Sequence, residues 1–126
     1  MTKVATTGII WDRDKVLIGQ RKRDGRWELP GGKVDPGETP GECIVREIHE
    51  ELGLRVRVEK NLGVVEGEYR GIPMKVHAFV MAVIGGTPSP NVHLALEWIA
   101  LRRTDEFDIV EEDRIVLEKW RLMQGV

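Results

Sequence analysis

Three glutamates lie close together in the segment from Arg46 to Gly53, which reads REIHEELG. If this segment is helical, the ~100° turn per residue places Glu47, Glu50 and Glu51 within an arc of about 100°. Like charges three and four positions apart destabilise a helix, so a neighbouring cation would stabilise the cluster. Carboxylate oxygens suit Mg²⁺ or Mn²⁺, whereas zinc is disfavoured because no Cys or paired His accompanies the acids. The alternative interpretation is a solvated acidic helix face.

The signals for a helix around these glutamates are strong. Thr39-Pro40-Gly41-Glu42 has the form of a capping box with proline at the first helical position, and Gly53 stands where a left-handed C-terminal cap belongs. Apolar residues at four-residue spacing predict the buried stripe of this helix: Ile44, Ile48 and Leu52. The acids therefore border the buried face, with Glu51 only ~20° from Ile44.

Most of the remaining apolar patterning is typical of β-strands. Strands are expected at residues 4–11, 16–18, 27–29, 54–58, 64–69, 74–84 and 94–101. Pro30-Gly31-Gly32 is expected to end the third strand, because proline lacks a backbone donor and glycine adopts unusual backbone angles. Helical spacing of Val116, Trp120 and Met123 predicts a second helix near residues 110–123. This order of elements predicts an α/β fold with a mixed sheet packed by helices.

Composition and charge narrow the class of protein. With 126 residues, 32% charged and 41% apolar, one domain over residues 1–126 is expected. The longest apolar run, Ala78 to Ile84, is far shorter than the ~20 residues that span a bilayer, and no signal peptide is expected. The single cysteine, Cys43, excludes an internal disulfide and is typical of a reducing compartment such as the cytoplasm. The net charge of −2 disfavours a nucleic-acid polymer as partner. It is compatible with a small anionic ligand bound by a few basic groups.

A longer pattern begins at Gly32. The residues that follow it at fixed spacing are Glu38, Arg46, Glu47, Ile48, Glu50, Glu51, Gly53 and Leu54. This pattern resembles the Nudix box, matched at every specified position. The flanking segments are similar to the MutT-type branch of that family: residues 8–10, 16–21, 27–33 and 96–98. The resemblance implies an α/β/α sandwich around a mixed sheet and hydrolysis of a nucleoside diphosphate linked to another group, a nucleoside triphosphate in the MutT-type branch.

The resemblance also implies roles for the box residues. Glu47, Glu50 and Glu51 would hold divalent metal ions, Mg²⁺ or Mn²⁺, together with the backbone carbonyl of Gly31. The metal would neutralise phosphate oxygens and lower the pKa of a bound water. Glu47 and Glu50 are the two candidates for the base that removes the proton of this water. Arg46 is expected to pair with Glu38, which would hold the preceding loop against the helix.

Four further residues are candidates for contact with the nucleotide. Arg21 occupies the place of a substrate-contacting arginine in MutT-type proteins, and its guanidinium could grip a phosphate through two donors. A solvated turn around Asp24-Gly25 is the alternative for Arg21. Glu28 and Trp27 enter the site on the third strand, with a structural ion pair and core packing as their respective alternatives. Asp113 lies in an acidic triplet near the place where some relatives carry a base-reading asparagine, and could accept from an exocyclic amino group.

The acidic residues at positions 111–113, in place of an asparagine, are one departure from the family, and a second departure lies at Val92; two other functions also remain open. Val92 and His93 stand where many MutT-type relatives have an acidic residue followed by His, so a metal ligand or base candidate is missing. His93 and Glu97 are the candidates to substitute for it. A dinucleoside polyphosphate hydrolase is the alternative enzymatic interpretation, because some such relatives carry a tyrosine soon after the box and Tyr69 follows it here. A nucleotide sensor without catalytic activity is a further interpretation, although such domains tend to lose box acids. Homodimers are common in the family, and a homodimer is compatible with the sequence.

Overall fold

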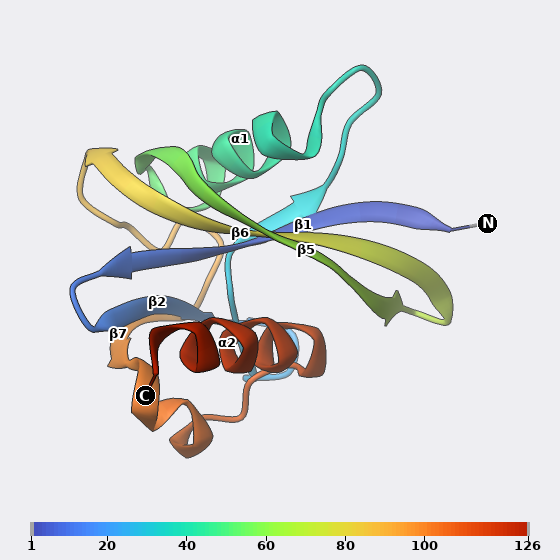
Figure 1. Ribbon diagram of the computed structural model, residues 1–126. Coiled ribbons are helices and arrows are strands. Elements are labelled where there is room, and N and C mark those ends of the chain that lie inside the picture. Colours follow the sequence, from blue (N-terminus) through green and yellow to red (C-terminus); the bar gives the residue numbers. More distant parts are fainter. Residues whose placement is uncertain (1, 126) are drawn as a thin grey trace.

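Two helices lie on opposite faces of a mixed sheet in the computed structural model, which describes residues 2–125 (Figure 1). They are α1 (Pro40–Leu52) and α2 (Glu111–Gln124). The other elements are β1 (Lys3–Asp12), β2 (Lys15–Gln20), β3 (Trp27–Glu28), β4 (Gly31–Lys33), β5 (Arg55–Tyr69), β6 (Ile72–Gly85), β7 (Ala95–Ala100) and the 3₁₀-helix η1 (Leu101–Glu106). The predicted α/β fold, a sandwich around a mixed sheet, is confirmed.

Strand β1 organises the sheet. Its first eight residues pair in parallel with β6, and β6 pairs antiparallel with β5. Its last two residues pair with β2, and β2 also pairs with β3 and β7. Short strand β4 adds to β1 on the side away from β6, so that Gly31 lies opposite Thr7 and Gly32 opposite Thr6. The sheet thereby places the Gly31–Gly32 segment directly beside α1.

The core divides between the two faces of the sheet because neighbouring residues of a strand point in opposite directions. Ile10 of β1 packs toward α1, in a cluster with the predicted stripe of Ile44, Ile48 and Leu52. Ile9 packs toward α2, in a cluster with Val116, Leu117 and Trp120. Burying a side chain of this size contributes about 1.5–3 kcal/mol, so each helix is fixed mainly by its apolar face.

The predicted caps of α1 are confirmed. Thr39 Oγ1 accepts from the backbone N–H of Glu42 at 3.1 Å, and the Glu42 carboxylate accepts from the backbone N–H of Thr39 at 2.9 Å. Gly53 ends the helix in the left-handed region with φ 72°. No helix between residues 2 and 125 has the length and apolar character needed to cross a bilayer.

One expectation about the strands is wrong, and one strand was not predicted. The strands predicted at 54–58 and 64–69 are one strand, β5, which continues through register shifts at Val58/Lys60 and Asn61/Gly63. The intervening polar residues are accommodated because β5 lies at the edge of the sheet, where bulges are tolerated. The chain also forms β4 at Gly31–Lys33, after the break that Pro30 was expected to impose, because β1 offers it an antiparallel partner.

Candidate active site

The three glutamates of α1 lie on the helix face that meets β4. Glu51 is buried, with 8% of its surface exposed, whereas the side chain of Glu50 is half exposed. Glu47 lies between these extremes, against Gly32. A Cβ atom on Gly32 would come within 2.5 Å of the Glu47 carboxyl carbon, so glycine at this position is what lets the carboxylate approach the strand.

Glu51 and Glu47 interact directly. Burial raises the pKa of Glu51 well above its usual range, and the neighbouring carboxyl of Glu47 raises it further through a hydrogen bond and its charge. The backbone N–H of Gly31 donates to Glu51 and acts in the opposite direction. Two carboxyl groups so close together favour a shared proton, or a cation in its place.

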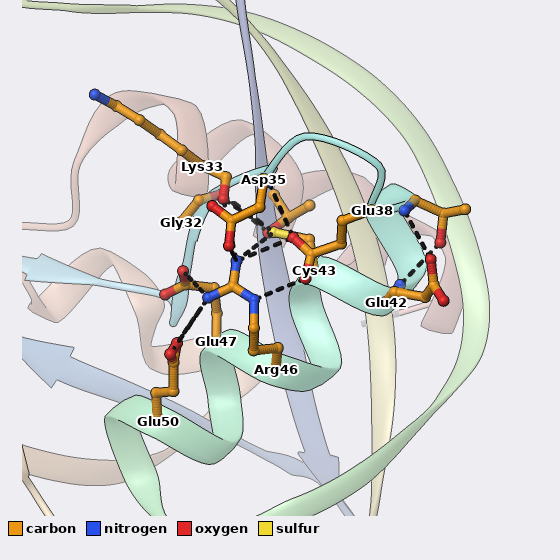
Figure 2. A network of polar contacts seen from close by, with 11 residues as sticks. Gly32, Lys33, Asp35, Glu38, Glu42, Cys43, Arg46, Glu47 and Glu50 are labelled. Atoms are coloured by element: carbon orange, nitrogen blue, oxygen red, sulfur yellow. Dashed lines mark hydrogen bonds and ion pairs between the residues drawn. The ribbon is translucent and has the colours of Figure 1, made fainter.

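Arg46 is the centre of an ion-pair network on the solvent side of the glutamates (Figure 2). Its guanidinium donates to Glu38 at 2.7 Å, to Glu47 at 2.9 Å and to Glu50 at 2.6 Å, and it lies 3.4 Å from Asp35. These contacts lower the pKa of Glu38 to about 2 and raise that of Arg46. The structure thus places Arg46 against Glu38, as the sequence predicts, and also against two of the box glutamates.

The arrangement of these acids fits a hard divalent cation. Among residues 2–125 no three potential ligands already converge on one point, because Glu47 and Glu50 turn toward Arg46. The donors are all carboxylate oxygens, with the Gly31 carbonyl on the adjacent strand, and this set suits Mg²⁺ or Mn²⁺. The positive charge of Arg46 and the proton favoured between Glu51 and Glu47 show that the cluster needs cationic compensation.

A cavity of about 200 Å³ opens beside these acids. Gly31 and Gly32 are part of its lining, and these two glycines also contact Glu51 and Glu47. Its apolar wall comes from β1 and β6: Ala5, Met74 and Val76, which pack together apart from the two main cores. Its charged lining includes Arg21, Glu28 and Asp113. The cavity therefore combines an apolar surface with a few fixed polar groups, as ligand sites do.

Asp113 is a fixed acceptor in the wall of this cavity. It is 6% exposed and lies in the first turn of α2. Its Oδ1 accepts from the hydroxyl of Thr7 at 2.7 Å, and its Oδ2 accepts from the backbone N–H of Leu29 at 2.9 Å. Burial raises the pKa of Asp113 to about 7, against the opposing effect of these two hydrogen bonds.

Arg21 and Glu28 lie on the wall that this cavity shares with a second one. The second cavity, of about 340 Å³, is also lined by Lys22, Arg23 and His93. Arg21 donates through Nε and Nη2 to Asp24, which lowers the pKa of that carboxyl to about 2, and its Nη1 lies 3.8 Å from Glu28 Oε1. The guanidinium is therefore held at the cavity wall by carboxylates on both sides.

The sequence as a whole matches one family. The NUDIX domain profile matches residues 1–120. The chain belongs to the NUDIX family. It is 35% identical over 122 residues to a Mycobacterium tuberculosis protein named putative 8-oxo-dGTP diphosphatase 2, covering 90% of this chain and 84% of that protein. It is 30% identical over 130 residues to the Escherichia coli CTP pyrophosphohydrolase, covering 99% of this chain and 96% of that protein.

The fold agrees with this assignment. The solution structure of the E. coli ORF135 protein superposes with a TM-score of 0.86 at 29% identity, covering 98% of this chain and 91% of that one. The protein is thus a Nudix hydrolase of the MutT type, in agreement with the resemblance found in the sequence.

Not every residue predicted for this Nudix site lies at the cavity. Trp27 packs edge-to-face on Phe107 with ring centroids 5.5 Å apart, and it does not line either cavity described above. The structure therefore favours the core-packing alternative for Trp27. Glu97, a possible substitute ligand, is exposed on β7. Tyr69 ends β5, but its side chain lies outside the described residues.

Two residues of the Nudix site were not assigned these contacts from the sequence. Thr7 supplies the hydroxyl that fixes Asp113, and nothing in its strand pattern distinguishes it from other residues of β1. His93, considered only as a substitute metal ligand, instead contacts Glu28. One signal in the sequence could have indicated a role for His93. It lies five residues before Trp98 and next to Val92, where the sequence departs from the family pattern.

Proposed function

We propose that this Nudix hydrolase uses Mg²⁺ or Mn²⁺ to cleave a (deoxy)nucleoside triphosphate into a monophosphate and pyrophosphate. The observation that carries the proposal is the continuity of the site. One cavity reaches from Gly31 and Gly32, beside the box glutamates, to the buried carboxyl of Asp113. It has an apolar wall for a nucleobase and an arginine for phosphate, and the acids for a metal lie next to its Gly31 and Gly32 lining.

The residues divide the chemistry as follows. Glu47, Glu50, Glu51 and the carbonyl of Gly31 would hold the metal, which when bound neutralises phosphate oxygens and acidifies water. Glu47 or Glu50 accepts the proton of the attacking water. The water oxygen forms a bond to phosphorus, and the bridging oxygen leaves with the electrons of the broken P–O bond. Arg21 holds a phosphate group through Nη1, while its hydrogen bonds from Nε and Nη2 to Asp24 keep the guanidinium in place.

Asp113 would select the base. Each carboxylate oxygen has room for about two hydrogen bonds, and the protein uses one on each oxygen. The remaining capacity suits an exocyclic amino group, as found on cytosine and guanine. The names of the two relatives support this choice, because the nucleotides in those names, CTP and 8-oxo-dGTP, both carry such an amino group.

Matched pairs of substrates test this proposal. CTP and UTP differ at the position of the amino group, as do GTP and ITP. We expect faster cleavage of the amino-bearing member of at least one pair in Mg²⁺, and no cleavage when EDTA removes the metal. Equal rates within both pairs would contradict the role of Asp113, and turnover in EDTA would contradict the metal site.

A nucleotide sensor is the main competing function. All the acids of the Nudix box are present, which is expected of an enzyme. Substituting Glu50→Gln separates the two functions, since it should abolish turnover by an enzyme and leave nucleotide binding by a sensor largely unchanged.

A further inference from the structure

His93 is a buried histidine, and one of its two ring nitrogens has a polar partner among residues 2–125. It lies in the segment between β6 and β7, and its side chain is only 2% exposed. The ring packs against Gly19 of β2, where an added Cβ atom would come within 2.7 Å of ring atoms. Glycine at position 19 therefore makes room for the imidazole.

The contact of His93 is with Glu28. The ring Nε2 lies 2.8 Å from Glu28 Oε2, across a separation of 65 residues in the chain. The other ring nitrogen, Nδ1, is buried without a partner in the described part of the chain. A buried donor without an acceptor is costly, so the ring proton belongs on Nε2, which donates to the carboxylate.

This hydrogen bond leaves Glu28 Oε1 for Arg21, whose Nη1 lies 3.8 Å away. Asp24 binds the other side of the same guanidinium. Asp24, Arg21, Glu28 and His93 thus form a line of contacts from the turn after β2 to the segment before β7. All except Asp24 line the second cavity, and Arg21 and Glu28 line both cavities.

Without the hydrogen bond from His93, the Glu28 carboxylate would lose the contact that holds Oε2 in its present position. A free Glu28 carboxylate could close the 3.8 Å gap to Arg21 and occupy the Nη1 donor that a phosphate would use. His93 prevents this by holding Oε2.

We propose that His93 is a positioning residue, which fixes Glu28 so that Arg21 keeps a donor for the substrate phosphate. This inference rests on the proposed function. It assigns His93 no contact with the metal or the substrate. Loss of the hydrogen bond should therefore weaken substrate binding more than it slows the chemical step.

The test compares KM and kcat for wild type, His93→Ala and His93→Gln, with Leu94→Ala as control. Leu94 is the exposed neighbour of His93. A hydrogen bond to a charged group is commonly worth about a tenfold change in an equilibrium, so we expect KM to rise about tenfold in His93→Ala. We expect kcat to stay within about twofold. His93→Gln, which keeps an N–H donor, should restore part of the loss, and Leu94→Ala should resemble wild type.

Two further measurements separate positioning from packing. Imidazole added to His93→Ala should lower KM, because it can refill the ring-sized space above Gly19. In a Glu28→Ala background, His93→Ala should leave KM unchanged. Equal effects of His93→Ala with and without Glu28, or a fall in kcat with KM unchanged, would overturn the inference while the proposed function stands.

Nuclear magnetic resonance of the imidazole nitrogens supplies a readout that needs no turnover. We expect the proton on Nε2 in wild type and a changed Nε2 signal in Glu28→Ala. A proton on Nδ1 would overturn the inference even in an active enzyme. If wild type cleaves no nucleotide, the proposed function fails, and the role of His93 in substrate binding fails with it, whatever the tautomer.

Discussion

The hydroxyl of Thr7 donates a 2.7 Å hydrogen bond to Oδ1 of Asp113, which joins β1 to the first turn of α2. With the backbone N–H of Leu29 on Oδ2, this bond fixes both carboxylate oxygens at the cavity wall. Fixed acceptors discriminate between ligands because a wrong ligand leaves them unpaired or opposes them with another acceptor. We therefore expect the geometry around Asp113 to determine which nucleobase the enzyme prefers.

Replacing Asp113 should alter base selectivity. We expect Asp113→Ala to reduce the preference for CTP over UTP, or for GTP over ITP, by about tenfold or more, the usual value of a hydrogen bond to a charged group. The measurement is kcat/KM for each pair in Mg²⁺. Asp105→Asn is a suitable control because its side chain is 87% exposed. An unchanged ratio in Asp113→Ala would show that the base is read elsewhere.

Asp113 should also make stability depend on pH. Its pKa is raised from 3.8 to about 7 in the folded protein, so the folded state binds more protons than the unfolded state between these values. Its contribution to stability is therefore fully present below pH ~4 and is lost as pH rises through about 7. Each pKa unit corresponds to about 1.4 kcal/mol.

Urea denaturation at several pH values between 4 and 8 measures this effect. Comparison of wild type with Asp113→Asn isolates Asp113 from other titrating groups. We expect the free energy of unfolding of wild type to fall with pH relative to the variant. Parallel profiles for the two proteins would mean that Asp113 is ionised throughout this range.

Glu50→Gln should lower kcat by at least about 100-fold, because it removes a residue that we propose as both a metal ligand and a candidate base. Glu50 is half exposed and interacts with Arg46, so the fold should tolerate the substitution. Glu59→Gln, an exposed change on β5, serves as the control. Steady-state turnover of a triphosphate is the measurement, and a kcat near that of wild type would remove Glu50 from the chemistry.

Glu51→Gln should separate stability from metal binding. Burial disfavours an ionised carboxylate at this position, and an amide avoids that cost. Without metal, at neutral pH, we therefore expect the variant to be more stable than wild type by about 1 kcal/mol. Added Mg²⁺ should raise the Tm of wild type and of Glu59→Gln more than that of Glu51→Gln. The idea fails if the variant is less stable without metal and responds to Mg²⁺ as fully as wild type.

The sequence predicts the α1 end of the site well because that information is local. Thr39, Glu42 and Gly53 mark the ends of the helix, and the spacing of Glu47 and Glu51 relative to the apolar stripe places them at its buried edge. Arg46 and Glu38 are only eight residues apart, and their predicted ion pair forms.

The end of the cavity that contains Asp113 depends on contacts between distant segments. Thr7 and Asp113 are 106 residues apart, and Glu28 and His93 are 65 apart. Periodicity along each strand does not say which strands become neighbours, so these contacts could not be derived from it. Trp27 illustrates the same point, since its packing on Phe107 depends on where the chain passes after η1.

The most direct test of the central claim is product analysis after incubation with nucleotides in Mg²⁺, with and without EDTA. The panel should contain (deoxy)nucleoside triphosphates including CTP and 8-oxo-dGTP, a dinucleoside polyphosphate and ADP-ribose, with products resolved by chromatography. We predict monophosphate and pyrophosphate from an amino-bearing triphosphate, in the presence of metal only. Diphosphate and inorganic phosphate as products, faster cleavage of the dinucleoside polyphosphate, or nucleotide binding without turnover would contradict it.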